Sequence, residues 1–87
     1  MKMGSPFLNV LPSLDIHGHT RETMYVVVSD FINDNIKLGN SKIVIIHGIG
    51  LKVLSNELKL RFNHDKRVKN IYLSPDNSGC SILELNI

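Results

Sequence analysis

The chain has 87 residues, which allows a single domain close to the lower size limit for a self-sufficient hydrophobic core. Its formal net charge of +2 is too small to imply nucleic-acid binding by itself. The single cysteine excludes a disulfide within these residues and favours a cytoplasmic setting. No apolar run approaches the ~20 residues of a membrane span, so we expect no membrane partner.

Residues 1–13 are predicted to form an N-terminal arm ahead of a domain over residues 14–87. Pro6 and Pro12 disfavour regular structure in this segment. Its large apolar side chains are Phe7, Leu8, Val10 and Leu11. Such side chains are stabilised by leaving water, so we expect the arm to lie against the domain or against a partner.

The first predicted strand runs from Leu14 to His17, and Gly18 ends it. Successive side chains of a strand point to opposite faces, so Asp15 and His17 would share one face. Leu14 and Ile16 would share the other face, which we expect the helices to cover. The acid and the imidazole would then stand together on the open face.

A helix is predicted from Arg21 to Lys37. Thr20 suits the N-cap position, and Gly39 is a typical C-terminal stop. The apolar residues recur at helical spacing: Met24, Val27, Val28, Phe31 and Ile32.

The segment from Lys42 to Ile46 is apolar on both faces, which is typical of a central parallel strand. A second helix is predicted from near Leu51 to the region of Asn63 to Lys66. Its apolar stripe consists of Leu51, Leu54, Leu58 and Phe62. Lys52 would lie in the first turn of this helix.

Val68 to Leu73 and Cys80 to Leu85 are the third and fourth predicted strands, joined by a turn-rich connection over residues 74–79. The element order is therefore βαβαββ. Right-handed crossovers place both helices on one face of a four-stranded mixed sheet, which is a two-layer α/β sandwich. Cys80 is expected to be a small buried hydrophobe rather than a nucleophile.

Two strand-to-helix turns carry the candidate site. If the first two strands are parallel neighbours, both turns lie at the same sheet edge, where ligands of open α/β sheets bind. The second turn, His47-Gly48-Ile49-Gly50, precedes a helix N-terminus, where main-chain N–H groups favour a phosphate. Lys52 could add a cationic contact. The plainer interpretation is that the glycines are there for steric reasons alone.

Asp15 and His17 suit general acid–base chemistry, because a carboxylate can orient a neighbouring imidazole. On RNA, His17 could take the proton from a 2′-hydroxyl. On DNA, water would attack and Asp15 could hold a metal ion such as Mg²⁺. Asp15 alone is a poor magnesium site, so metal-free RNA cleavage is favoured. Alternatively, Asp15 caps the turn and His17 satisfies a buried backbone group.

A zinc site is not expected. The spacing of His17, His19 and His47 suggests one, but no fourth histidine or cysteine is well placed. The stretch from Lys52 to Lys69 carries six basic residues against two acids, a basic flank that serves RNA or DNA equally. The sequence does not predict the oligomeric state, because either the edge strands or the arm could mediate a dimer.

The residues match a known family. Leu14-Asp15-Ile16-His17-Gly18 resembles the LDLHG motif of the Smr (small MutS-related) domain family, and His47-Gly48-Ile49-Gly50 resembles its HGxG or TGxG motif. The resemblance extends from about Leu14 to Leu85. It implies a fold like the C-terminal domain of bacterial translation initiation factor three. It also implies nucleic-acid binding, since the family includes nicking endonucleases and nucleases that cut messenger RNA at stalled ribosomes.

Carried over to this sequence, the resemblance gives two sets of site residues. Asp15 and His17 are the catalytic candidates. The phosphate-binding candidates from the resemblance are His47, Gly48 and Gly50. To these the sequence itself adds Gly18 of the first turn and three basic side chains expected to follow the nucleic-acid backbone, Lys52, Lys59 and Arg61. The expected function is an endonuclease or nicking domain that acts on RNA or DNA.

Two positions depart from the family pattern. Ile49 replaces the Lys or Arg that the second motif often carries, and Gly79 stands alone where many members have a paired glycine. An apolar side chain cannot neutralise a developing phosphorane charge, although Lys52 could compensate. Ile49 thus favours the alternative, a non-catalytic module that binds RNA, DNA or the ribosome. A third hypothesis is a protein-interaction domain that uses the N-terminal arm.

Overall fold

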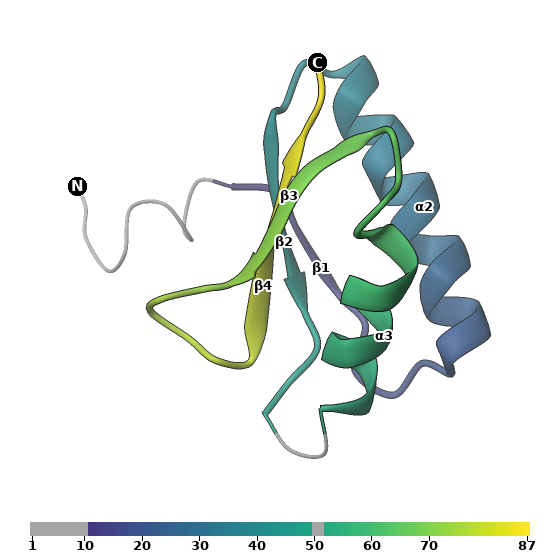
Figure 1. The fold of residues 1–87 in the computed structure, drawn as a ribbon, viewed down its shortest axis with the longest axis vertical. Coiled ribbons are helices and arrows are strands. Elements are labelled where there is room, and N and C mark those ends of the chain that lie inside the picture. Colours follow the sequence, from purple (N-terminus) through teal and green to yellow (C-terminus); the bar gives the residue numbers. More distant parts are fainter. Residues whose placement is uncertain (1–10, 50–51) are drawn as a thin grey trace.

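The computed structural model describes residues 11–49 and 52–87, and these form one mixed sheet covered by two helices (Figure 1). In chain order the elements are β1 (Ser13–Asp15), α2 (Arg21–Lys37), β2 (Lys42–Ile46), α3 (Val53–Phe62), β3 (Val68–Leu73) and β4 (Cys80–Leu85). The strand order is β1-β2-β4-β3, with β1 and β2 parallel and the other neighbours antiparallel. The predicted βαβαββ sandwich is confirmed.

Most element bounds agree with the sequence predictions. α2, β2, β3 and β4 begin and end where they were expected. α3 begins at Val53, and the predicted start near Leu51 lies outside the described residues, as does Gly50. A bulge between Val68 and Asn70 shifts the pairing of β3 with β4, which the pattern did not reveal.

The predicted end of the first strand, His17, lies two residues beyond the observed end. β1 ends at Asp15, although the main-chain N–H of Ile16 still donates to Ile46 at 2.8 Å. The chain then turns, because His19 donates its N–H to the carbonyl of Ile16 at 3.1 Å. Gly18 permits this turn with a φ of +84°. His17 therefore belongs to the turn and not to the strand.

The main core lies between the helices and one face of the sheet, and both helices lie on the same side of the strands (Figure 1). It consists of Ile16, Met24, Val28, Ile32, Ile43, Ile45, Leu58, Phe62, Val68, Ile71, Leu83 and Leu85. Their removal from water is the main stabilising contribution to the fold. α2 starts with a capping box between Thr20 and Thr23, which satisfies main-chain N–H groups that the helix leaves unpaired. Among the described residues, no helix is long and apolar enough to cross a membrane.

The opposite sheet face carries a smaller apolar cluster. Val44, Cys80 and Ile82 are buried there, and Leu11 packs against them. The described end of the predicted arm therefore contacts this face, whereas residues 1–10 lie outside the described residues. Burial raises the pKa of the Cys80 thiol, which disfavours the reactive thiolate. The position fits the predicted buried hydrophobe.

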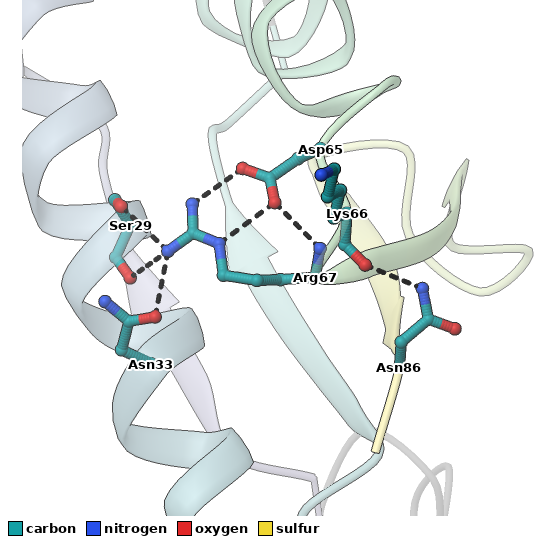
Figure 2. Close-up of polar contacts among 6 residues, drawn as sticks. All are labelled: Ser29, Asn33, Asp65, Lys66, Arg67 and Asn86. Carbon is teal, nitrogen blue, oxygen red and sulfur yellow. Dashed lines mark hydrogen bonds and ion pairs between the residues drawn. The ribbon is translucent and has the colours of Figure 1, made fainter.

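A polar network ties α2 to the loop before β3 (Figure 2). Arg67 binds Asp65 through Nε at 2.9 Å and Nη2 at 2.6 Å, and its Nη1 donates to the Ser29 carbonyl, the Ser29 hydroxyl and Asn33. After β4, the main-chain N–H of Asn86 donates to the carbonyl of Arg67. Arg67 is thus committed to holding the fold together rather than to binding a ligand.

Candidate functional site

The candidate site lies at the edge where the parallel strands β1 and β2 end. Asp15 is paired with Ile46, so the turns after both strands leave the sheet side by side. β4 begins at the same edge, because Cys80 is paired with Ile46. Both helices also start at this end of the molecule, which is the lower end in Figure 1. The predicted meeting of the two turns is therefore confirmed.

Asp15 and His17 form a hydrogen-bonded pair in the first turn. One carboxylate oxygen, Asp15 Oδ1, accepts from the main-chain N–H of His17 at 3.0 Å and lies 2.5 Å from His17 Nδ1. Both side chains are exposed, 49% for Asp15 and 74% for His17. The hydrogen bond from the His17 ring, followed by the one from its main chain, lowers the pKa of Asp15 below its ordinary value.

This geometry has a different origin from the predicted one. A turn, and not a shared strand face, brings Asp15 and His17 together, since the carboxylate accepts the N–H two residues later. The capping role and the orienting role of Asp15 therefore occur together. Because His17 Nδ1 donates to the carboxylate, Nε2 carries the lone pair in the neutral ring. No hydrogen bond to Nε2 is formed within the described residues, so this atom is available to a ligand.

His19 lies on the other side of Gly18, and its exposed ring is held in place. Its Nδ1 lies 3.2 Å from the hydroxyl oxygen of Thr23, the residue that completes the capping box of α2. Sequence reasoning considered His19 only as a zinc ligand. Its position two residues after His17 was the signal that could have identified it.

His47 is buried, with 8% of its surface exposed, and both ring nitrogens have partners. Nδ1 lies 3.0 Å from the carbonyl oxygen of Gly48, and Nε2 lies 2.8 Å from the Ser81 hydroxyl. A carbonyl can only accept, so Nδ1 carries the proton and, in the neutral ring, the Ser81 hydroxyl donates to Nε2. The ring thus anchors the second turn to β4 and does not face solvent, where a phosphate would bind.

The second turn is closed against the loop before β4. The carbonyl oxygen of Gly79 accepts the main-chain N–H groups of His47 at 3.0 Å and Gly48 at 2.9 Å. Gly48 has a φ of +86°, which favours glycine. A side chain at Gly79 would lie 3.3 Å from the main chain of Gly48 and from Ile49. The N–H of Gly48 is therefore used internally, while Ile49 is 79% exposed.

Lys52 is the N-cap of α3. The sequence had placed it in the first turn of the helix. Its φ is +63°, which is rare for a residue with a side chain, and its side chain forms no capping hydrogen bond. Lys52 and Lys59 line a groove of about 180 Å³ between α3 and β3. Ser55 and Asn56 complete the helix side of this groove, and Ser81 lies on its sheet side.

Arg61 lies apart from the groove. Its Nε donates to Glu57 at 2.5 Å, and its guanidinium stacks over the ring of Tyr25 at 5.4 Å from the centroid. The hydrogen bond to Glu57 raises the pKa of Arg61. The structure therefore places Lys52 and Lys59 along one groove, but it directs Arg61 toward α2. This arrangement disfavours the predicted role of Arg61 along a nucleic-acid backbone.

The fold and this edge together define a two-layer α/β domain with an acid–imidazole turn at the end of a parallel strand pair. The chain belongs to the Smr domain family, whose family model matches residues 14–81. The resemblance seen in the two motifs is thereby confirmed.

Individual relatives support the same conclusion. The chain is 31% identical over 81 residues to the protein named endonuclease MutS2 of Caldanaerobacter subterraneus subsp. tengcongensis. The match covers 90% of this chain and 10% of MutS2, so the chain spans about a tenth of that relative.

Two crystal structures share the fold. The Smr domain of Thermus thermophilus MutS2 has a TM-score of 0.84 at 22% identity, covering 88% of this chain and all of that chain. YdaL, a stand-alone small MutS-related protein from Escherichia coli, has a TM-score of 0.80 at 17% identity, covering 99% of this chain and 79% of YdaL. At these identities the likeness establishes the fold alone.

Proposed function

We propose that the chain is a small endonuclease domain that cleaves nucleic-acid phosphodiesters, with RNA as the favoured substrate. The observation that carries this proposal is the Asp15–His17 pair, whose exposed imidazole is oriented by a carboxylate. A matching relative bears the name endonuclease, which supports the same class of reaction.

On RNA, the proposed reaction starts when His17 Nε2 removes the proton of a 2′-hydroxyl. The 2′-oxygen attacks phosphorus, and the bond from phosphorus to the 5′-oxygen breaks. The products are a 2′,3′-cyclic phosphate and a 5′-hydroxyl end. Asp15 holds the ring in the productive tautomer and stabilises the imidazolium that forms.

Positive charge near this edge would bind the phosphate backbone. Lys52 precedes α3 at the end of the sheet where β1 and β2 end, and Lys59 lies two helical turns further along the groove. Lys52 supplies a cation that Ile49 does not. Gly50, which lies outside the described residues, is a further candidate contact. Such contacts make binding weaker as salt increases.

The donor set at this edge does not fit a magnesium ion held by the protein. Asp15 Oδ1 already accepts two hydrogen bonds from His17. Within residues 11–49 and 52–87, no group of three His, Cys, Asp or Glu side chains could hold a metal ion. The proposed reaction therefore has no step that depends on a metal, and neither magnesium nor zinc is assigned to it.

The test is a cleavage assay on end-labelled single-stranded RNA and on supercoiled DNA, each with magnesium and with EDTA. We expect RNA cleavage in both conditions, and we expect His17→Ala to abolish it while the variant still folds. His64→Ala is the matched control, because His64 is an exposed histidine beyond the end of α3. Equal cleavage by wild type and His17→Ala would refute the mechanism.

A second candidate function is a non-catalytic module that binds RNA, DNA or the ribosome. The exposed Ile49 and the internally bonded N–H of Gly48 favour it, because neither can stabilise charge on a phosphorane. This function predicts salt-sensitive binding without cleavage in any metal condition. The same assay, combined with a binding titration, distinguishes the two.

A further inference from the structure

The first turn presents two histidines, of which the reaction above uses only one. His17 and His19 lie on either side of Gly18, in a turn closed by the hydrogen bond from the main-chain N–H of His19 to the carbonyl of Ile16. Residues two positions apart have Cα atoms at most about 7 Å from each other. Both rings are exposed, so a single bound phosphodiester could contact both.

Cleavage through the 2′-hydroxyl requires a proton donor as well as a base. The 5′-oxygen departs as an alkoxide unless it is protonated, and an alkoxide is a poor leaving group. Asp15 cannot supply this proton, because its carboxyl is held in the ionised form by His17. His47 is buried with both ring nitrogens bonded, and the Cys80 thiol is buried within an apolar cluster.

His19 meets the requirements of such a donor. The contact of its Nδ1 with the Thr23 hydroxyl fixes the ring, since Thr23 is itself held by Thr20 in the capping box. Within the described residues no hydrogen bond engages Nε2, so this atom can carry a proton toward a ligand.

We propose that His19 is the general acid that protonates the leaving 5′-oxygen, an assignment that rests on the proposed function. His17 takes the 2′-hydroxyl proton as the bond from the 2′-oxygen to phosphorus forms. His19 gives its proton from Nε2 to the 5′-oxygen as the bond from phosphorus to that oxygen breaks. The enzyme then holds a protonated His17 and a neutral His19, and exchange with water restores both.

The test compares two RNA oligonucleotides of the same sequence. One has the ordinary 5′-oxygen at a single cleavable position, and the other has sulfur there. A thiolate leaves without protonation, so a variant that lacks only the acid should still cleave the sulfur substrate. The variant is His19→Asn, because an asparagine amide can still donate to the Thr23 hydroxyl. His19→Gln is the second variant, and thermal unfolding by circular dichroism verifies that each is folded.

We expect His19→Asn to cleave the oxygen substrate about 10²- to 10⁴-fold more slowly than wild type. Its rate on the sulfur substrate should stay within a few-fold of the wild-type rate. His17→Ala should be slow on both substrates, because the base is needed with either leaving group.

Other outcomes overturn the assignment. If both His19 variants are equally slow on both substrates, His19 serves binding or structure. If they match wild type on the oxygen substrate, His19 is not the acid. If wild type cleaves neither substrate, the proposed function fails and the assignment fails with it. One further outcome concerns the base alone. If His17→Ala cleaves both substrates like wild type while the His19 variants are slow only on the oxygen substrate, the proposed base is wrong and the assignment of His19 as the acid is supported.

Discussion

The main-chain N–H of Gly48 donates a hydrogen bond of 2.9 Å to the carbonyl oxygen of Gly79. This bond closes the glycine turn against the start of β4, at the place where the sequence predicted a phosphate. The main role of this turn is therefore structural, because it connects β2 to α3 and is bonded to the start of β4. Any ligand must be bound by what this connection leaves exposed, including the first turn and Lys52.

Gly48→Ala should destabilise the fold. At a φ of +86° an L side chain costs about 1–2 kcal/mol, so we expect a loss of that size in the free energy of unfolding. Urea titration followed by circular dichroism measures it. Gly48→Asn is the control, because asparagine tolerates this conformation better and should lose less. An alanine variant as stable as wild type would mean that the turn can adopt another conformation.

His47 and Ser81 should behave as a coupled pair. Ser81→Ala leaves Nε2 of the buried His47 without its partner, which costs about 1–3 kcal/mol of unfolding free energy. His47→Ala should cost at least as much, and the double variant should lose less than the sum of the single losses. Chemical denaturation of the four proteins tests the coupling. Strict additivity would show that the contact contributes nothing.

Asp65 should make the fold sensitive to acid. The Arg67 side chain lowers the pKa of Asp65 below its ordinary 3.8, so the folded state favours the ionised carboxylate. This stabilisation is fully present above pH 3.8 and is lost as the pH falls through the lowered value. Asp65→Asn should lower the free energy of unfolding at pH 7 by about 1–3 kcal/mol. The free energy of unfolding of this variant should also decrease less steeply as the pH falls. Melting temperatures between pH 7 and pH ~2 measure this, with the exposed Asp30→Asn as control.

Lys52→Gly should separate binding from stability. Glycine relieves the strained φ of +63° but adds entropy to the unfolded chain, so the unfolding free energy should change by less than about 1 kcal/mol. Loss of the cation should weaken RNA binding and reduce the slope of log affinity against log salt by about 1. Fluorescence anisotropy at several salt concentrations measures this slope. Lys69→Ala is the matched control, because Lys69 lies with Lys42 at the opposite end of the sheet.

Asp15→Asn should impair cleavage and leave the fold unchanged. An amide can still accept the main-chain N–H of His17, but it carries no charge to stabilise the imidazolium. We expect the RNA cleavage rate to fall about 10²- to 10⁴-fold, with RNA affinity little changed. Single-turnover kinetics beside a binding titration distinguish the two effects. A variant that cleaves normally would show that His17 acts without its carboxylate.

Local patterns in the sequence were sufficient for most of the architecture. The cap at Thr20 and the stop near Gly39 define α2, and the apolar run of β2 indicates a strand in the middle of the sheet. The end of β1 was not predictable in this way, since it depends on the turn that Gly18 permits. Strand alternation indicated the right pair, Asp15 and His17, but the two side chains meet because of the turn and not because they share a strand face.

The site residues that differ from expectation depend on distant parts of the chain. His47 is turned inward by Ser81, and the amide of Gly48 is bound by Gly79. Arg61 is drawn toward α2 by stacking on Tyr25. Nothing in a local window shows these contacts, because each joins segments that meet only in the folded sheet and helix layers.

The two outer strands of the sheet are poor templates for further strands. β1 has three residues, and β3 carries the bulge between Val68 and Asn70. A short edge offers few unpaired main-chain groups, and a bulge disturbs the regular spacing that an added strand needs. Lys69 adds an exposed charge at that bulge. The domain is thereby protected against edge-to-edge aggregation, even at the high local concentrations that would arise if many copies gathered on one nucleic acid.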